Sequence, residues 1–154
     1  MSEMLVRLSI KGIALDNQED VPVVILEDSR HLRVLPVPVG PFEANAIIVM
    51  LKGIRTPRML THELFANFMM ENRFTVTKLI LSGKRDSGYK AAMFYRRGRK
   101  NRLLEVRPSD GIALTLQFHN PVYTEEHLLY PKKAILSRYV SPFIEKEKQN
   151  YTLM

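Results

Sequence analysis

The fold of this chain is decided at one stretch, Pro36-Val37-Pro38-Val39-Gly40-Pro41-Phe42-Glu43-Ala44-Asn45-Ala46-Ile47. The stretch predicts a strand that ends in prolines and a helix that begins at Pro41, because the N–H that proline lacks would have no partner at the first helical position. Glu43 then falls near the third helical position, where a carboxylate meets the positive end of the helix dipole. The stretch therefore predicts a strand–helix corner with an acid at the start of the helix.

The same pattern recurs in the second half of the chain. Glu105-Val106-Arg107 predicts a strand end, and Pro108-Ser109-Asp110-Gly111-Ile112-Ala113-Leu114 predicts the start of another helix. Aligning the two prolines places Glu43 on Asp110. We therefore expect the chain to make one kind of corner twice, each time with a carboxylate two residues after the proline.

Composition limits the class of protein. The chain has 154 residues, of which 45% are hydrophobic, and this is most simply one domain with its own core. There is no cysteine, which excludes disulfides and thiolate metal sites. No apolar run approaches the roughly 20 residues needed to span a bilayer, so no membrane association is expected. The first residues alternate apolar and polar side chains and lack the apolar core of a signal peptide, so we expect a cytoplasmic protein.

The net charge of +7 is concentrated in one segment. Between residues 84 and 102 there are eight bases against one acid, Asp86, a surplus equal to that of the whole chain. The bases are Lys84, Arg85, Lys90, Arg96, Arg97, Arg99, Lys100 and Arg102. Such a cluster attracts phosphates or an acidic partner. A solvated hairpin turn would show the same pattern, and the sequence leaves both interpretations open.

Apolar periodicity predicts two antiparallel meanders. The strands are expected at Met4–Leu15, Val21–Leu26, Leu32–Val39, Phe74–Leu81, Tyr89–Tyr95 and Arg102–Arg107. Gly12 interrupts the alternation of the first strand, which suggests a bulge. Pro36 and Pro38 place the end of the third strand at a sheet edge, because proline cannot donate to a strand ladder.

Three helices are expected between and after the strands. The first begins at Pro41, the second is capped by Thr61, and the third runs from Pro108 to about Phe118. Their inward residues are predicted to be Ala44, Ile47, Ile48 and Leu51, then Leu64, Phe65, Phe68 and Met69, then Ile112, Ala113 and Leu116. The result is a single α+β domain, with a mixed sheet packed against helices over 1–130 and a C-terminal helical extension over 131–154.

Three stretches together resemble the bifunctional nuclease domain family. They are Pro36 to Ile47 as quoted above, then Pro57-Arg58-Met59-Leu60-Thr61-His62-Glu63-Leu64, then Val106-Arg107-Pro108-Ser109-Asp110-Gly111-Ile112-Ala113-Leu114. Their order and spacing agree with the family, and the resemblance covers roughly Met4 to Leu129. The chain departs from the family where Glu63 replaces the usual Asp, Met59 the usual Pro, and Gly111 the usual Ala.

The resemblance implies a nuclease with a basic surface for its substrate, because the family takes its name from DNase and RNase activity attributed to plant members. It brings no established set of catalytic residues. The roles that follow are therefore inferred from the types and positions of the residues.

Hydrolysis of a phosphodiester bond needs an activated water, help for the leaving oxygen and positive charge on the phosphate. Nucleases often meet these needs with a divalent metal held by carboxylates. The catalytic candidates lie at or near predicted helix starts and are Glu43, His62, Glu63 and Asp110. If the two corners pack together, Glu43 and Asp110 could bind Mg²⁺ or Mn²⁺, or share a proton. His62 could act as an acid or base near neutral pH.

Positive side chains complete this hypothesis. Arg58 and Arg107 could hold phosphate oxygens in bidentate fashion. The segment that includes Arg96, Arg97, Arg99 and Lys100 would bind the rest of the nucleic acid.

A structural interpretation of the same residues stays open. Helix starts prefer acids, which alone would explain Glu43, Glu63 and Asp110. Arg107 is near enough in sequence to pair with Asp110 and lock the corner, and His62 could be a surface residue. The rival function is a non-catalytic domain that binds nucleic acid or an acidic protein through its basic segment.

We also expect a homodimer, because edge strands, apolar tail residues and eight methionines leave room for self-association.

Overall fold

The computed structural model describes residues 4–83, 88–135, 137–139 and 144–145. The elements begin with β1 (Leu5–Leu15), β2 (Pro22–Asp28), β3 (Arg33–Pro38), α1 (Pro41–Leu51) and α2 (Thr61–Glu71). They continue with β4 (Phe74–Gly83), β5 (Tyr89–Arg97), β6 (Lys100–Val106) and α3 (Pro108–Phe118). The chain then forms β7 (Val122–Glu125), a 3₁₀ turn (Glu126–Leu128), β8 (Tyr130–Pro131), α4 (Lys132–Ile135) and β9 (Ile144–Glu145). The predicted α+β class is confirmed.

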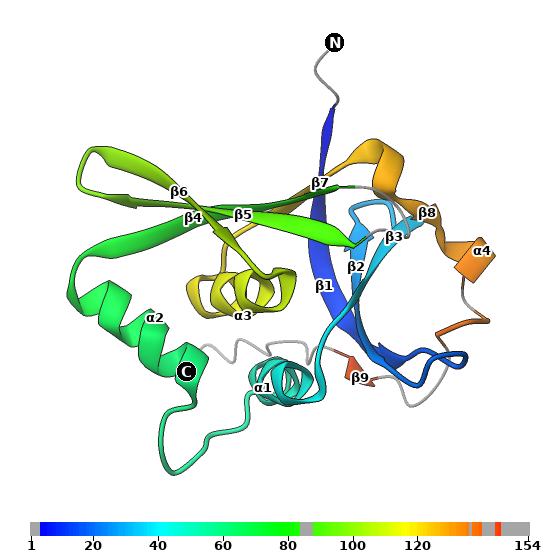
Figure 1. Cartoon of the computed structure of the whole chain (residues 1–154), viewed down its shortest axis with the longest axis horizontal. Helices are drawn as coiled ribbons and strands as arrows, with labels where there is room; N and C mark the ends of the chain where they lie inside the picture. Colours follow the sequence, from blue (N-terminus) through cyan, green and yellow to red (C-terminus); the bar gives the residue numbers. More distant parts are fainter. Residues whose placement is uncertain (1–3, 84–87, 136, 140–143, 146–154) are drawn as a thin grey trace, which may run out of the picture.

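One mixed sheet organises these elements. Its strand order is β6-β5-β4-β7-β1-β2-β3-β8, and β9 pairs with β1 beside this path. Strands β1 to β3 pair antiparallel in chain order, as do β4 to β6. The two groups are joined through β7, which pairs parallel with β4 and antiparallel with β1. α3 lies under the β4–β6 group, with α1 beneath α3 and α2 beside them (Figure 1).

Local features of the first strands agree with the sequence patterns. The register of β1 against β2 shifts between Ile10 and Gly12, so the predicted bulge is confirmed. β8 pairs with β3 only at Arg33 and Val34. Among the described residues, the outer edge of β3 therefore has no strand partner at Pro36 and Pro38, where a missing N–H costs no ladder hydrogen bond.

Helix α2 corrects one prediction. Of the four residues expected to face the core, only Met69 is buried, whereas Leu64, Phe65 and Phe68 are exposed. The helix instead turns Ala66 and Met69 inward, and the small Ala66 side chain lets the helix pack closely against its neighbours. The apolar residues of α2 fit more than one helical stripe, so periodicity alone did not select the buried one.

Gly111 explains how α3 packs against the sheet. A Cβ at this position would lie 2.6 Å from Leu79 Cδ1 and 3.3 Å from Val106 Cγ2. Leu79 is fully buried and packs among the other apolar side chains of the main core. The glycine lowers the intrinsic stability of the helix by about 0.5–1 kcal/mol relative to alanine, but it allows α3 to approach β4.

A network around three buried acids, which we name the tail network, ties residues 126–138 to the first three strands and their connecting turns. Arg138 donates to Asp16 over 3.0–3.1 Å, Lys132 pairs with Glu27 at 3.0 Å, and Arg33 links Asp28 to Glu126. Its members are Lys11, Asp16, Glu27, Asp28, His31, Arg33, Glu126, Lys132 and Arg138. The predicted helical extension from residue 131 contains the four-residue α4 and the two-residue β9 among the described residues.

Candidate active site

The two strand–helix corners meet where α1 packs against α3. Both helices have proline in the first turn and an acid close behind it, Glu43 in α1 and Asp110 in α3. Arg107, immediately before α3, joins these acids. Its Nε donates to Asp110 Oδ2 at 2.9 Å, its Nη2 to Asp110 Oδ1 at 3.2 Å, and its Nη1 to Glu43 Oε1 at 3.2 Å. The structure therefore brings both corner acids to one guanidinium.

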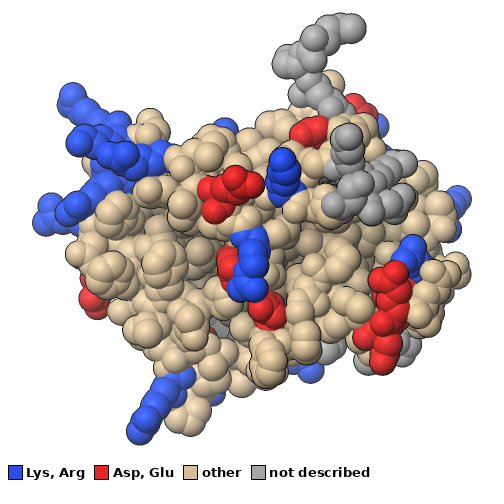
Figure 2. All heavy atoms as spheres, in the orientation of Figure 1, with Lys and Arg blue, Asp and Glu red and all other residues tan. Residues whose placement is uncertain are grey.

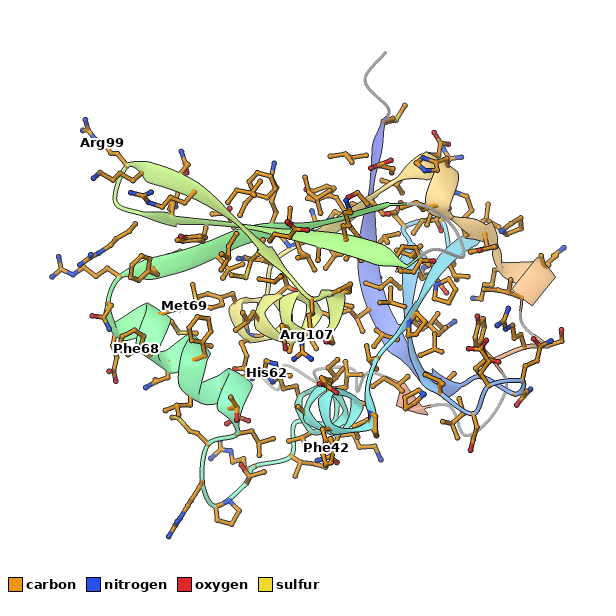
Figure 3. All side chains as sticks on the ribbon, in the orientation of Figure 1. Phe42, His62, Phe68, Met69, Arg99 and Arg107 are labelled. Carbon is orange, nitrogen blue, oxygen red and sulfur yellow. The ribbon has the colours of Figure 1, made fainter. Side chains whose placement is uncertain are left out.

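His62 joins them from a third helix start. It lies in the first turn of α2, and its Nε2 is 2.9 Å from Asp110 Oδ1. A carboxylate can only accept, so the hydrogen between these atoms belongs to Nε2, and in the neutral ring Nδ1 is the basic nitrogen. We name Glu43, His62, Arg107 and Asp110 the corner cluster; Figure 3 shows His62 and Arg107 facing one another between the helices.

The electrostatics of the corner cluster keep Asp110 ionised. Burial acts to raise the pKa of Asp110, but hydrogen bonds from Arg107 and His62 outweigh it and hold this pKa below the ordinary value of 3.8. The His62 side chain is only 19% exposed, whereas that of Arg107 is 66% exposed. The cluster therefore has a shielded histidine–carboxylate pair and an open guanidinium.

Gly40 makes room for the carboxylate of Glu43. The backbone of Gly40 is extended, with φ −69° and ψ 160°, a conformation that any residue can adopt. A Cβ at Gly40, however, would overlap Glu43 Oε2. The glycine therefore leaves free the space that the Glu43 carboxylate occupies, and it allows the Glu43 side chain to fold back toward Arg107.

Glu63 lies outside the corner cluster. It lines a cavity of about 240 Å³ between the C-terminal parts of α1 and α3. The other residues around this cavity are Val49, Met50, Gly53, Ile54, Leu116, Gln117 and His119. His62 and Glu63 are adjacent in sequence, but their side chains point to different sides of α2.

Of the basic residues predicted to bind nucleic acid, Arg107 belongs to the corner cluster and the others do not. Arg58 is exposed in the loop between α1 and α2, and Arg96, Arg97, Arg99 and Lys100 surround the turn between β5 and β6. Figure 2 shows basic side chains gathered at that end of the molecule. Six residue steps along β6 separate Lys100 from Val106, so at about 3.3 Å per step the turn lies roughly 20 Å from the corner cluster.

The predicted metal ligands are Glu43 and Asp110, and between them lies the guanidinium of Arg107. Both oxygens of Asp110 already accept hydrogen bonds. No group of three or more His, Cys, Asp or Glu side chains in the described part of the chain is arranged to hold a metal ion. The Mg²⁺ or Mn²⁺ site stays a prediction, and it requires Arg107 to give way to the ion.

Fold and site together define an α+β domain in which three helix starts share one acid–arginine–histidine cluster. Residues 24–136 match the bifunctional nuclease domain family, and the chain belongs to that family. The match includes both corners and α2. Two uncharacterized proteins, from two strains of Mycobacterium tuberculosis, are each 28% identical over 120 residues, which is 78% of this chain and 71% of theirs. The family supports a nuclease-like or nucleic-acid-binding function.

Two features of this region were not predicted from the sequence. The first is the spatial requirement at Gly40, which becomes visible only once the Glu43 rotamer is known. The second is the exposure of apolar residues around the site, namely Phe42 in α1 and Leu64, Phe65 and Phe68 in α2. No helix in the described residues is both long and apolar enough to cross a membrane.

Proposed function

We propose that this protein binds nucleic acid and hydrolyses its phosphodiester bonds at the corner cluster. The observation that supports this most is the hydrogen bond between His62 and Asp110 beside the open guanidinium of Arg107. A histidine oriented by a carboxylate is a general base, and an arginine at the same place is a phosphate ligand.

His62 supplies the proton transfer. With Nε2 held by Asp110, Nδ1 is the nitrogen that accepts a proton from the attacking water as its oxygen bonds to phosphorus. Asp110 stabilises the imidazolium that forms, because its lowered pKa keeps it negative throughout the neutral range. The protonated ring then returns the proton to the leaving oxygen.

Arg107 binds the phosphate. A guanidinium has five N–H donors, and the contacts with Glu43 and Asp110 use three of them. The remaining donors bind two phosphate oxygens while Glu43 keeps the group in position. The starts of α1, α2 and α3 add the positive ends of three helix dipoles. If Glu43 and Asp110 instead hold Mg²⁺ or Mn²⁺ as predicted, Arg107 gives way and that ion supplies the positive charge to the phosphate.

A cleavage assay tests this proposal. Labelled RNA and DNA are incubated with the purified full chain, in Mg²⁺, in Mn²⁺ and in EDTA. We expect cleavage by the wild type and a loss of about 10²–10⁴-fold in His62→Ala, the usual contribution of a general base. Glu63→Gln is the matched control, since Glu63 is the neighbouring residue outside the cluster. Equal cleavage by wild type and a folded His62→Ala variant would remove the proposed site.

A non-catalytic nucleic-acid-binding domain is the second candidate. The exposed bases around the β5–β6 turn favour it, because they lie apart from the corner cluster and do not need it. It predicts salt-dependent binding without cleavage under any of the metal conditions.

The homodimer and the cytoplasmic location stay predictions. Sedimentation of the purified chain tests the homodimer.

A further inference from the structure

We propose that the nucleic acid bound here is single-stranded and that its bases stack along the outer stripe of α2, formed by Leu64, Phe65 and Phe68. This inference rests on the nucleic-acid binding proposed above and specifies its substrate class. The strand would run from the basic β5–β6 turn, along α2, to the corner cluster at the start of that helix.

The outer stripe is unusual because large apolar side chains face solvent there. Leu64, Phe65 and Phe68 are 58%, 45% and 60% exposed. Leu64 and Phe65 lie four and three residues before Phe68, which places all three on one side of the helix. The opposite side, with Ala66 and Met69, already provides the core contact. Exposed apolar patches of this kind mark binding sites, and flat aromatic rings suit the faces of unpaired bases.

Positive charge lies at both ends of the stripe. Beyond the C-terminal end of α2, the register of β4 with β5 places Phe74 opposite Arg97 and Thr75 opposite Arg96. Before its N-terminal end lies the exposed Arg58, and beside that end lies Arg107. Figure 3 shows Phe68 between Arg99 and His62. A basic segment, an aromatic segment and a second basic segment in this order are what a flexible polyanion with stacking bases requires.

The dimensions agree with a short single strand. From Leu64 to Phe68 the stripe covers four residue steps, or about 6 Å at 1.5 Å per residue. Stacked bases along one strand are about 3.4 Å apart, so the stripe is long enough for about two bases. In a duplex, the base faces are covered by their neighbours and the rings on α2 would meet only backbone and groove edges.

A second copy of this chain is the other occupant that an apolar stripe could serve. The charges at both ends favour the polyanion, because two copies meeting at this stripe would bring like-charged basic segments toward one interface. Self-association through the stripe is therefore treated as an outcome of the test.

Fluorescence anisotropy with labelled oligonucleotides tests this inference. A 10-nucleotide single strand and its duplex are titrated in EDTA with the His62→Ala chain, so that cleavage does not interfere. We expect the single strand to bind more tightly than the duplex. Adding Phe65→Ala and Phe68→Ala should weaken single-strand binding by about 10-fold or more, the usual cost of lost stacking, with little change for the duplex. Met70→Ala, an exposed apolar residue outside the stripe, is the control and should bind like its parent.

Equal affinity for single strand and duplex, or unchanged binding after loss of both phenylalanines, would overturn the inference. So would phenylalanine variants that change a dimer into a monomer in sedimentation while oligonucleotide binding is unaffected. These results are separable from failure of the proposed nuclease. Wild type that cuts duplex and single strand equally contradicts only the inference, whereas phenylalanine-dependent binding without cleavage contradicts only the catalytic proposal.

Discussion

The tail network and the corner cluster are both built from acids paired with bases, yet they differ in what remains available. In the tail network, Asp28 is 2% exposed and accepts from the backbone N–H groups of Leu32 and Arg33 and from the Arg33 side chain. In the corner cluster, Arg107 is mostly exposed and His62 uses one ring nitrogen on Asp110. The comparison teaches that ion pairs alone do not indicate a site: the useful signal is a partly open group with donors or acceptors to spare.

The largest effect on folding is expected from Asp28→Ala. Loss of the carboxylate leaves two backbone N–H groups and the Arg33 side chain without their acceptor. We expect the free energy of unfolding to fall by about 2–4 kcal/mol, since each partly buried donor that loses its acceptor costs up to about 1–3 kcal/mol. Denaturant titration measures this, and the refolded fraction should cleave normally. A variant as stable as wild type would contradict a structural role for the tail network.

Acid should destabilise the protein through the same network. The hydrogen bond from Arg138 lowers the pKa of Asp16 below its ordinary 3.8. Burial acts to raise the pKa of Asp28, but its bonds with Arg33 and Leu32 lower it below 3.8. A carboxyl group whose folded pKa is depressed contributes stability above its unfolded pKa and loses that contribution as pH falls through the folded pKa.

We therefore expect the melting temperature to be steady at neutral pH and to fall below about pH 4, the unfolded aspartate value. Asp28→Ala, which lacks one of these groups, should show a weaker dependence in that acid range. The same slope in both proteins would mean that Asp28 does not contribute.

Gly40→Ala separates position from folding within the corner cluster. The backbone conformation at residue 40 suits alanine, but the new Cβ displaces the Glu43 carboxylate. We expect cleavage to fall about 10-fold or more, since a 1 Å misplacement of a positioning group has effects up to about 100-fold, with the melting temperature nearly unchanged. Normal cleavage by Gly40→Ala would show that the position of Glu43 is unimportant.

The smallest effect is expected from single charges at the β5–β6 turn. Replacing Arg99 by Gln should weaken nucleic-acid binding for all sequences. It should also reduce the salt slope, the slope of the logarithm of the binding constant against the logarithm of the salt concentration, by about one. Replacement of Lys133, an exposed base of α4, by Gln provides the control with an equal change of charge. Identical salt slopes in the two variants would leave the turn without a specific role.

The sequence predicted the parts of the fold that depend on local rules. Proline in the first turn and an acid behind it located the starts of α1 and α3, and Gly12 located the bulge in β1. It did not predict that β7 would enter between β4 and β1, because a four-residue strand has little pattern of its own. The buried face of α2 was predicted wrongly apart from Met69, since the apolar residues of this helix fit two stripes.

The candidate site was predictable only in part. The proximity of Arg107 to Asp110 follows from a separation of three residues. The contact of His62 with Asp110 joins residues 48 apart and depends on how α2 packs beside α3, which no local pattern encodes. The same reason explains why Glu63, adjacent to His62, was expected in the site and lies on another side of the helix.

The most direct test of the corner cluster is to measure the cleavage rate and the melting temperature of Asp110→Asn and to compare both with wild type. This substitution keeps the size of the side chain but removes the charge that orients and stabilises the protonated His62. We expect cleavage of labelled single-stranded substrate to fall at least about 100-fold, while Glu63→Gln cleaves like wild type and all three proteins melt within a few degrees of one another. A folded Asp110→Asn protein that cleaves at the wild-type rate would contradict the assignment of this cluster as the active site.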